Sequence, residues 1–280
     1  MRPLGTLLRL RLFGPVAVLA LSSCGERHAE SYVAGLSDND RQIRLEASIS
    51  LIKLGGAAVQ PVIEHATVGS DSLRYISAQI LGQIGDRRAA PFLESLLEEP
   101  NAYVRAQGVR ALGQLADPGQ IPNLQQALVD DPVAEVRAEA AWSLGNLRNT
   151  TAVTALIEAM QDSSQLVRKG VLSALQYLWT PAAETTVIAA LGDGSETVRY
   201  VAAQLLGFHR SAPALDPLCR ALGDSSLWVR VESARALGAI GDTAVVARLE
   251  RLFADREGPD HDAAAEALRQ LTGLEYAISP

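Results

Sequence analysis

Residues 193–207 read DGSETVRYVAAQLLG, and this stretch decides the fold because the chain repeats its pattern along most of its length. An acidic residue is followed six positions later by an arginine, and a leucine comes seven positions after the arginine. Successive arginines are 30 to 32 residues apart, a period typical of arrays of stacked repeats. The arginines are Arg44, Arg74, Arg105, Arg137, Arg168, Arg199 and Arg230, and the leucines are Leu51, Leu81, Leu112, Leu144, Leu175, Leu206 and Leu237.

Each repeat is predicted to contain two helices, with Gly-Asp or Asp-Pro turns between repeats. The second helix is expected to begin at the acidic residue, because aspartate is a favourable N-cap and its charge suits the positive helix end. Pro100 and Pro132 would then occupy the first helical position, and Asp193 with Glu196 would form a capping box. The acids are Asp38, Glu99, Asp131, Asp162, Asp193 and Asp224, whereas the repeat around Arg74 has Val68 at this place.

The motif Asp-x5-Arg followed by Ala-x-x-Leu-Gly resembles the HEAT repeat in the short bacterial form named after the phycobilin lyases. The resemblance implies an all-α fold, an α-solenoid of about seven to eight HEAT-like helix pairs over residues 31–273, and a C-terminal tail over residues 274–280. It also implies a ladder of arginines and acids that connects successive repeats. The eighth repeat is degenerate, with His261 in the arginine position and Leu268 in the leucine position. A repeat fold says little about activity.

The N-terminus is predicted to be a lipoprotein signal peptide over residues 1–23. Arg2, Arg9 and Arg11 accompany an apolar stretch, residues 12–21, that is too short for a stable membrane span. Residues 21–24, LSSC, resemble the bacterial lipobox, which implies that Cys24 is lipidated and that residues 24–30 form a tether. The alternative is a plain signal peptide with an incidental cysteine. Gly25, in place of the aspartate that retains such proteins in the inner membrane, favours an outer-membrane anchor facing the periplasm.

Charge and composition exclude several classes of function. The net charge of −7 becomes −10 when residues 1–23 are removed, and an acidic chain is a poor candidate for nucleic-acid binding. The four histidines form no metal-binding pair, and the chain has neither a phosphate-binding loop nor a nucleophile elbow. We therefore expect no metal, no cofactor and no catalytic residue. Cys219 lies in an apolar pattern and is expected to be a small buried side chain.

One face of the second helices is predicted to be free for binding. Positions −2, +1, +2, +5 and +9 from each arginine lie opposite the apolar face at 100° per residue. The resemblance places this face along the concave side of the array, as a groove, and seven of the twelve aromatic residues after residue 23 occur on it. Exposed Tyr, Trp and Arg are typical of protein interfaces, although aromatic side chains at helical spacing also pack between repeats. The predicted groove residues are Tyr75, Tyr103, Arg110, Trp142, Tyr177, Tyr200, Gln204, Phe208, Trp228 and Arg235.

The sequence thus predicts a membrane-tethered scaffold that binds a protein or peptide partner through this groove. Three alternatives stay open at this point: a HEAT-like lyase or hydroxylase-type enzyme, a binder of cell-wall glycan, and a structural spacer. The repeat around Arg168 departs from the pattern, because Gln176 replaces the glycine and Trp179-Thr180-Pro181 follows. This departure indicates either a local change of packing or a functional break in the array.

Overall fold

The computed structural model describes residues 28–255 and 258–276. Cys24, the predicted signal peptide and the end of the predicted tail lie outside the described residues. Within these ranges the chain is helical and contains no strand, which confirms the all-α prediction. Residues 28–33 are already helical, so the predicted tether is helical at its end. None of the described helices combines the length and the apolar character needed to cross a membrane.

The chain divides into two compact units, and the boundary falls between Ala111 and Leu112. The first unit contains two helix pairs and most of a third. Short 3-10 turns extend several of its helices, for example η4 (Leu96–Glu98). Its α-helices are α2 (Arg41–Leu54), α3 (Val59–Thr67), α4 (Asp71–Ile84), α5 (Ala90–Ser95) and most of α6 (Ala102–Gln114).

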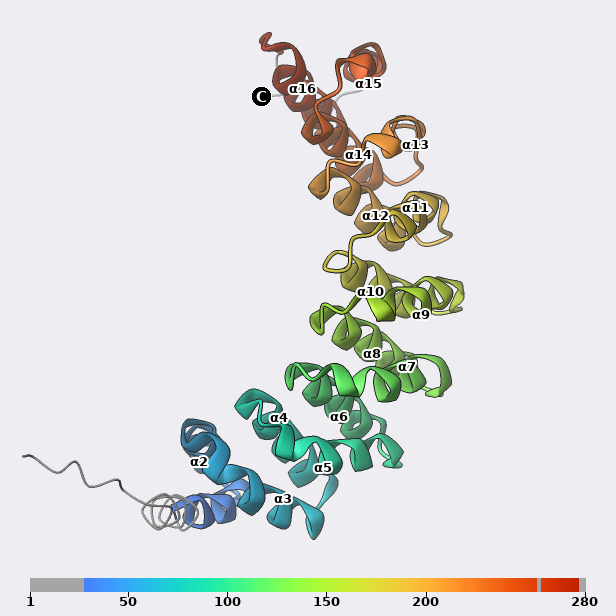
Figure 1. Cartoon of the computed structure of the whole chain (residues 1–280). Coiled ribbons are helices and arrows are strands. Elements are labelled where there is room, and N and C mark those ends of the chain that lie inside the picture. Colours follow the sequence, from blue (N-terminus) through green and yellow to red (C-terminus); the bar gives the residue numbers. More distant parts are fainter. Residues whose placement is uncertain (1–27, 256–257, 277–280) are drawn as a thin grey trace, which may run out of the picture. The chain divides into compact units, whose positions relative to one another are not determined.

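The second unit is a regular stack of helix pairs. In Figure 1 the second helices α8, α10, α12, α14 and α16 follow one another along one side of this unit, and the first helices lie along the other side. Each second helix packs against the next one in the stack. The bounds are α7 (Ile121–Asp130), α8 (Ala134–Asn146), α9 (Val153–Glu158), α10 (Gln165–Leu175), α11 (Pro181–Ala189), α12 (Glu196–Phe208), α13 (Leu215–Ala221), α14 (Leu227–Ile240), α15 (Val246–Asp255) and α16 (Pro259–Thr272). These pairs confirm the predicted α-solenoid.

The repeated leucine forms the centre of the core in both units. All seven leucines and Leu268 of the degenerate repeat are fully buried, at 0% exposure. Burial of a leucine side chain contributes about 1.5–3 kcal/mol to the free energy of unfolding. The constant spacing between arginine and leucine therefore reflects a constant packing position rather than a functional site.

The second helices begin two residues later than the sequence predicted. In the second unit α10, α12 and α14 have Ser164, Ser195 and Ser226 as N-caps, each two residues after the acid. The carboxylate of the acid instead accepts a hydrogen bond from the backbone N–H of that serine, at 2.8 Å for Asp193 and Ser195. The expectations of an acidic N-cap, of a capping box and of prolines at the first helical position were therefore wrong. Aspartate two residues before a serine stabilises a turn as readily as it caps a helix.

The acids are displaced from the cap because they bind the preceding arginine. Arg168 donates from Nε and Nη2 to the two carboxylate oxygens of Asp193, at 2.7 and 2.8 Å. The backbone carbonyl of Asp193 in turn accepts from Nη1 of Arg199, at 2.9 Å. Similar contacts connect Arg137 to Asp162 and Arg199 to Asp224, and Arg230 donates to Asp260. The implied ladder is confirmed in the second unit, and each such arginine–aspartate contact is called a rung below.

The irregular repeat is a change of packing between α10 and α12. At the regular joints a glycine follows the leucine, and a Cβ on Gly145 would lie 2.6 Å from the Cα of Ala174. At the joint between α10 and α12, Gln176 stands in place of this glycine. Leu205 stands in place of the small residue, such as Ala174, that contacts the glycine at the regular joints. Consistent with these larger side chains, α10 packs less extensively against α12 than against α8.

Candidate binding pocket

The aromatic side chains of the predicted groove are mostly exposed. Tyr75 on α4 and Tyr103 on α6 belong to the first unit, and the other five belong to the second. Six of the seven are between 36% and 79% exposed, and Tyr200 is half-buried. The alternative, in which these rings are core residues, does not fit this exposure. Their role in binding stays a prediction.

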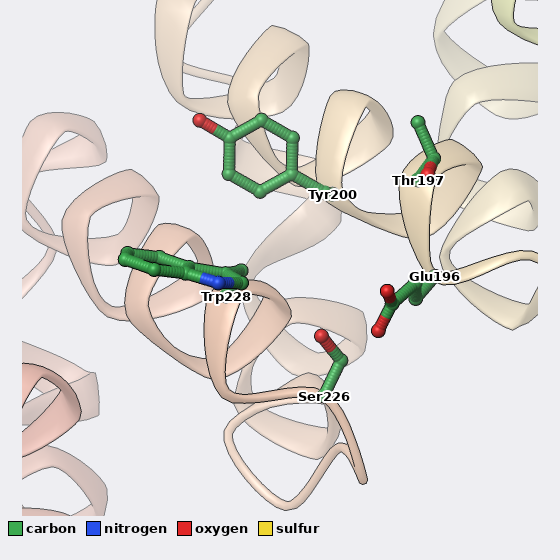
Figure 2. A pocket seen from close by; sticks show the side chains of 5 residues that line it. All are labelled: Glu196, Thr197, Tyr200, Ser226 and Trp228. Atoms are coloured by element: carbon green, nitrogen blue, oxygen red, sulfur yellow. The ribbon is translucent and has the colours of Figure 1, made fainter.

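Two of the predicted residues line one pocket of about 320 Å³ in the second unit. Tyr200 on α12 and Trp228 on α14 face the same space, which Glu196, Thr197 and Ser226 also line (Figure 2). Tyr200 is one residue after the arginine of its repeat, and Trp228 is two residues before the arginine of the next repeat. The pocket therefore lies where the exposed faces of two successive second helices meet.

A rung of the ladder holds this pocket together. Arg199, the neighbour of Tyr200, donates to both carboxylate oxygens of Asp224 at 2.7 and 2.8 Å. Asp224 Oδ1 also accepts from the backbone N–H of Ser226, which is the N-cap of α14 and lines the pocket. These hydrogen bonds fix the first turn of α14, and hence Trp228, against α12. The contact from Arg199 also lowers the pKa of Asp224 below its usual value, which keeps the carboxylate ionised.

The two helices that form the pocket carry the carboxylates of Glu196 and Glu232. Glu196 lines the pocket and has an exposed side chain. Glu232 lies one turn after Trp228 on α14, and burial raises the pKa of its carboxyl, although Arg235 at 3.7 Å opposes the shift. Aromatic faces beside a carboxylate form an environment that attracts a cation. The pocket can therefore accept an apolar or cationic side chain.

The structure does not bring the remaining predicted residues of the second unit into this pocket. Tyr177 lies under the guanidinium of Arg148, with 5.4 Å between the ring centre and Cζ. Phe208 makes an edge contact with His209 at 5.0 Å between ring centres. Trp142, Gln204 and Arg235 are exposed on α8, α12 and α14. Arg110, with Tyr75 and Tyr103, belongs to the first unit and lies on α6.

Sequence reasoning missed part of both the pocket and the irregular joint. Thr197, Glu196 and Ser226 line the pocket but lie at helix starts, which were predicted two residues too early. His209 stacks on Trp179 with 3.8 Å between ring centres, and its Nε2 is buried without a hydrogen-bond partner. Trp179 was noticed only as an irregularity, because the sequence gives no sign of which ring it would meet.

The sequence made two predictions about reactive side chains, one on metal ligands and one on the thiol of Cys219. No group of three or more His, Cys, Asp or Glu side chains that could bind a metal ion occurs among the residues 28–255 and 258–276. Cys219 is half-buried rather than buried, and Arg248, which pairs with Asp216 at 2.7 Å, also lies beside its thiol. The expectation of a fully buried thiol was therefore wrong.

Comparisons with known proteins identify the same architecture. YibA of Escherichia coli is 21% identical, with 94% of this chain and 99% of that chain covered and a TM-score of 0.62, which shows a shared fold. Phycocyanin lyase CpcE–CpcF of Nostoc is 25% identical over 53% of this chain and 98% of that chain, with a TM-score of 0.47. Human deoxyhypusine hydroxylase is 26% identical over 93% of this chain and all of that chain, with a TM-score of 0.43. No curated protein matches the chain.

The family is shown by matches over most of the sequence. The model for HEAT repeats matches residues 59–143, 121–185 and 184–269, which together cover more than two thirds of the chain. These matches begin in α3 and end inside α16, so they include every rung described above. The chain belongs to the HEAT-repeat family.

Proposed function

We propose that this protein is a membrane-tethered HEAT-repeat scaffold that binds a protein partner, and that the partner contacts the pocket between Tyr200 and Trp228. The pocket carries the proposal, because it joins an exposed tryptophan and a half-buried tyrosine with a carboxylate on two helices held by a rung. Trp and Tyr in such positions supply most of the binding energy in many interfaces. HEAT repeats generally mediate contacts between proteins, which supports this class of partner.

The chemistry of the pocket favours a basic side chain on the partner. A lysine or arginine between the Tyr200 and Trp228 rings would gain a cation–π contact, about 0.5–2 kcal/mol, and Glu196 would neutralise its charge. The net charge of −7, or −10 without residues 1–23, would also attract a basic partner and accelerate association. Glycan binding, the alternative noted for aromatic grooves, has no further observation in its favour.

The membrane tether rests on the N-terminal sequence alone. The basic residues, the apolar stretch and the LSSC sequence around Cys24 support a lipid anchor in the bacterial cell envelope, with the outer membrane favoured. Labelling of cells with a radioactive fatty acid tests this part directly. Incorporation into the wild type and none into Cys24→Ala is expected, whereas equal labelling of both proteins would contradict lipidation.

The pocket is tested by crosslinking in the native envelope with paired variants. Trp228→Ala is expected to abolish the crosslink to the partner, and Val129→Ala is the control because Val129 is an exposed apolar residue that neither lines the pocket nor belongs to the predicted groove. Circular dichroism of both variants confirms that the helices are intact. Retention of the same partner by a folded Tyr200→Ala, Trp228→Ala double variant would exclude this pocket.

A stoichiometric metal or pigment in the purified protein would favour the lyase or hydroxylase alternative instead.

A further inference from the structure

In the first unit, Arg44 lacks, among the described residues, the carboxylate partner that forms a rung with the arginines of the second unit. Arg44 donates from Nη1 to the backbone carbonyls of Asp38 and Asn39, at 2.6 and 3.0 Å, as the other arginines do to their own loops. The next repeat has Val68 where an acid would bind the Nε and Nη2 edge of Arg44. Among the residues that the structure describes, no carboxylate pairs with this edge. Val68 ends α3 in a conformation, φ −100° and ψ 4°, unlike the extended backbone of Asp193 at φ −61° and ψ 147°.

Arg44 also lines a pocket of about 390 Å³ between α2 and α4. Arg41 and Arg44 line one part of it, and Leu45, Ile49, Ile76 and Ile80 line much of the rest. Ile49 and Leu45 are 42% and 52% exposed, so both leave aliphatic surface open to solvent at this pocket. No carboxylate occurs among the described residues that line this pocket. The site therefore combines positive charge with exposed aliphatic surface.

We propose that this pocket binds an acidic peptide segment, in which an Asp or Glu side chain occupies the open edge of Arg44 and neighbouring aliphatic side chains cover the isoleucines. Charge complementarity carries the proposal, because the same arginine edge binds an aspartate in bidentate fashion at Arg137, Arg168 and Arg199. The ligand would supply the carboxylate that the chain itself lacks at this rung.

The polar groups of the pocket favour a peptide over a simple aliphatic acid. Gln79 and Gln83 lie four residues apart on α4 and both line the pocket. Each carboxamide can donate to and accept from a peptide unit, and a peptide backbone held against isoleucine side chains needs such partners. An acyl chain has no polar group that could form hydrogen bonds with these two amides. This site uses other helices and another unit than the Tyr200–Trp228 pocket, so the inference does not depend on the proposed function.

The test is selection from a bead-displayed library of random heptapeptides against the full chain. Enriched sequences are expected to carry Asp or Glu beside Leu, Ile or Val. The best peptide should bind at least tenfold more weakly to Arg44→Gln, and its own variant with Asn or Gln in place of the acid should lose as much affinity for the wild-type protein. The second comparison leaves the protein unchanged, so a folding defect of Arg44→Gln cannot imitate the result.

Trp228→Ala is the control that separates the two proposed sites. Peptides that occupy the α2–α4 pocket should bind this variant as they bind the wild type. The inference is wrong if selection yields no acidic peptides, or if the selected peptides lose affinity for Trp228→Ala and keep it for Arg44→Gln. Binding that is indifferent to the acid of the peptide would equally overturn it, because the open rung would then contribute nothing.

Discussion

Arg168 holds the carboxylate of Asp193 in the same bidentate geometry as Arg199 holds Asp224, although α10, which carries Arg168, and α12, which follows Asp193, are joined irregularly. The distances of 2.7 and 2.8 Å equal those between Arg199 and Asp224 at a regular joint. The joint between α10 and α12 lacks the glycine that allows close approach elsewhere. The ladder therefore fixes the register of successive repeats even where the helix packing differs.

Asp193→Asn should destabilise the second unit. The carboxylate is 11% exposed and accepts from Arg168 and from the backbone N–H of Ser195, so the substitution weakens charge-assisted hydrogen bonds at a nearly buried site. A loss of about 1–3 kcal/mol in the free energy of unfolding is expected from urea titration at pH 7. Asp216→Asn is the control, since the exposed pair with Arg248 should contribute nothing measurable. Equal effects of the two substitutions would contradict the structural role of the rung.

The rungs should make the protein sensitive to acid in a defined range. Hydrogen bonds from Arg137, Arg168 and Arg199 lower the pKa of Asp162, Asp193 and Asp224 below 3.8, the ordinary value for an aspartate. Their contribution is complete above this value and is lost as the pH falls through the lowered pKa values. Urea midpoints measured between pH 2 and 6 should therefore fall below about pH 4, and less steeply in Asp193→Asn. The idea fails if the two proteins show the same dependence on pH.

His209 should titrate at lower pH than an ordinary histidine. Burial against Trp179 lowers the pKa of the imidazole from 6.5, although the backbone of Gln176 and the charge of Glu184 oppose this shift. The unfolded chain then binds a proton more readily than the folded one, so stability declines as the pH falls from 6.5 through the lowered pKa. NMR of the ring protons measures the pKa. His209→Phe retains a ring for Trp179 to stack on and should remove this decline, and a normal pKa in the folded protein would refute the prediction.

Gly145→Ala should disturb the joint between α8 and α10. The added Cβ would lie 2.6 Å from the Cα of Ala174, and a backbone atom cannot move aside as a flexible side chain can. Overpacking of this kind typically costs about 1–3 kcal/mol. Gly192→Ala is the matched control, because a Cβ there meets nothing within 4 Å. Thermal unfolding of both variants should show a lower midpoint for Gly145→Ala alone, and a comparable loss in Gly192→Ala would show that close approach is not the cause.

The repeat pattern predicted the architecture but not how each second helix begins. The leucine positions could be assigned because their burial depends only on helical periodicity and on the stacking of like units. The start of each second helix was placed too early because Asp and Ser are favourable both in turns and at N-caps, and only the position of the preceding arginine decides between them. Asp193 shows this ambiguity, since it is a good cap by residue type and a rung in the structure.

The pocket was predicted in part for a related reason. Tyr200 and Trp228 were found because a helical wheel places them on the exposed face, but their proximity depends on how two repeats stack, which periodicity does not determine. The sequence showed that Val68 replaces an acid, but it did not predict the pocket beside Arg44. Isoleucines at helical spacing look the same in the sequence whether they are buried or line a pocket. The absence of the repeated acid at Val68 was the more informative feature of the sequence near this pocket.

The way in which one aspartate joins two arginines has a consequence for evolution. Since the carboxylate of Asp193 serves the repeat before it and the carbonyl of Asp193 serves the repeat after it, every regular seam offers the same pair of connections. Duplication or deletion of one whole period would leave all seams intact, so recombination between copies could change the length of the protein without redesign. Two seams differ from this pattern. The one between α2 and α4 has Val68 in place of the acid, and the one between α10 and α12 has Gln176 and Leu205 in place of a matched pair of small residues. A duplication that separated Gln176 from Leu205 would leave each facing an unsuitable neighbour.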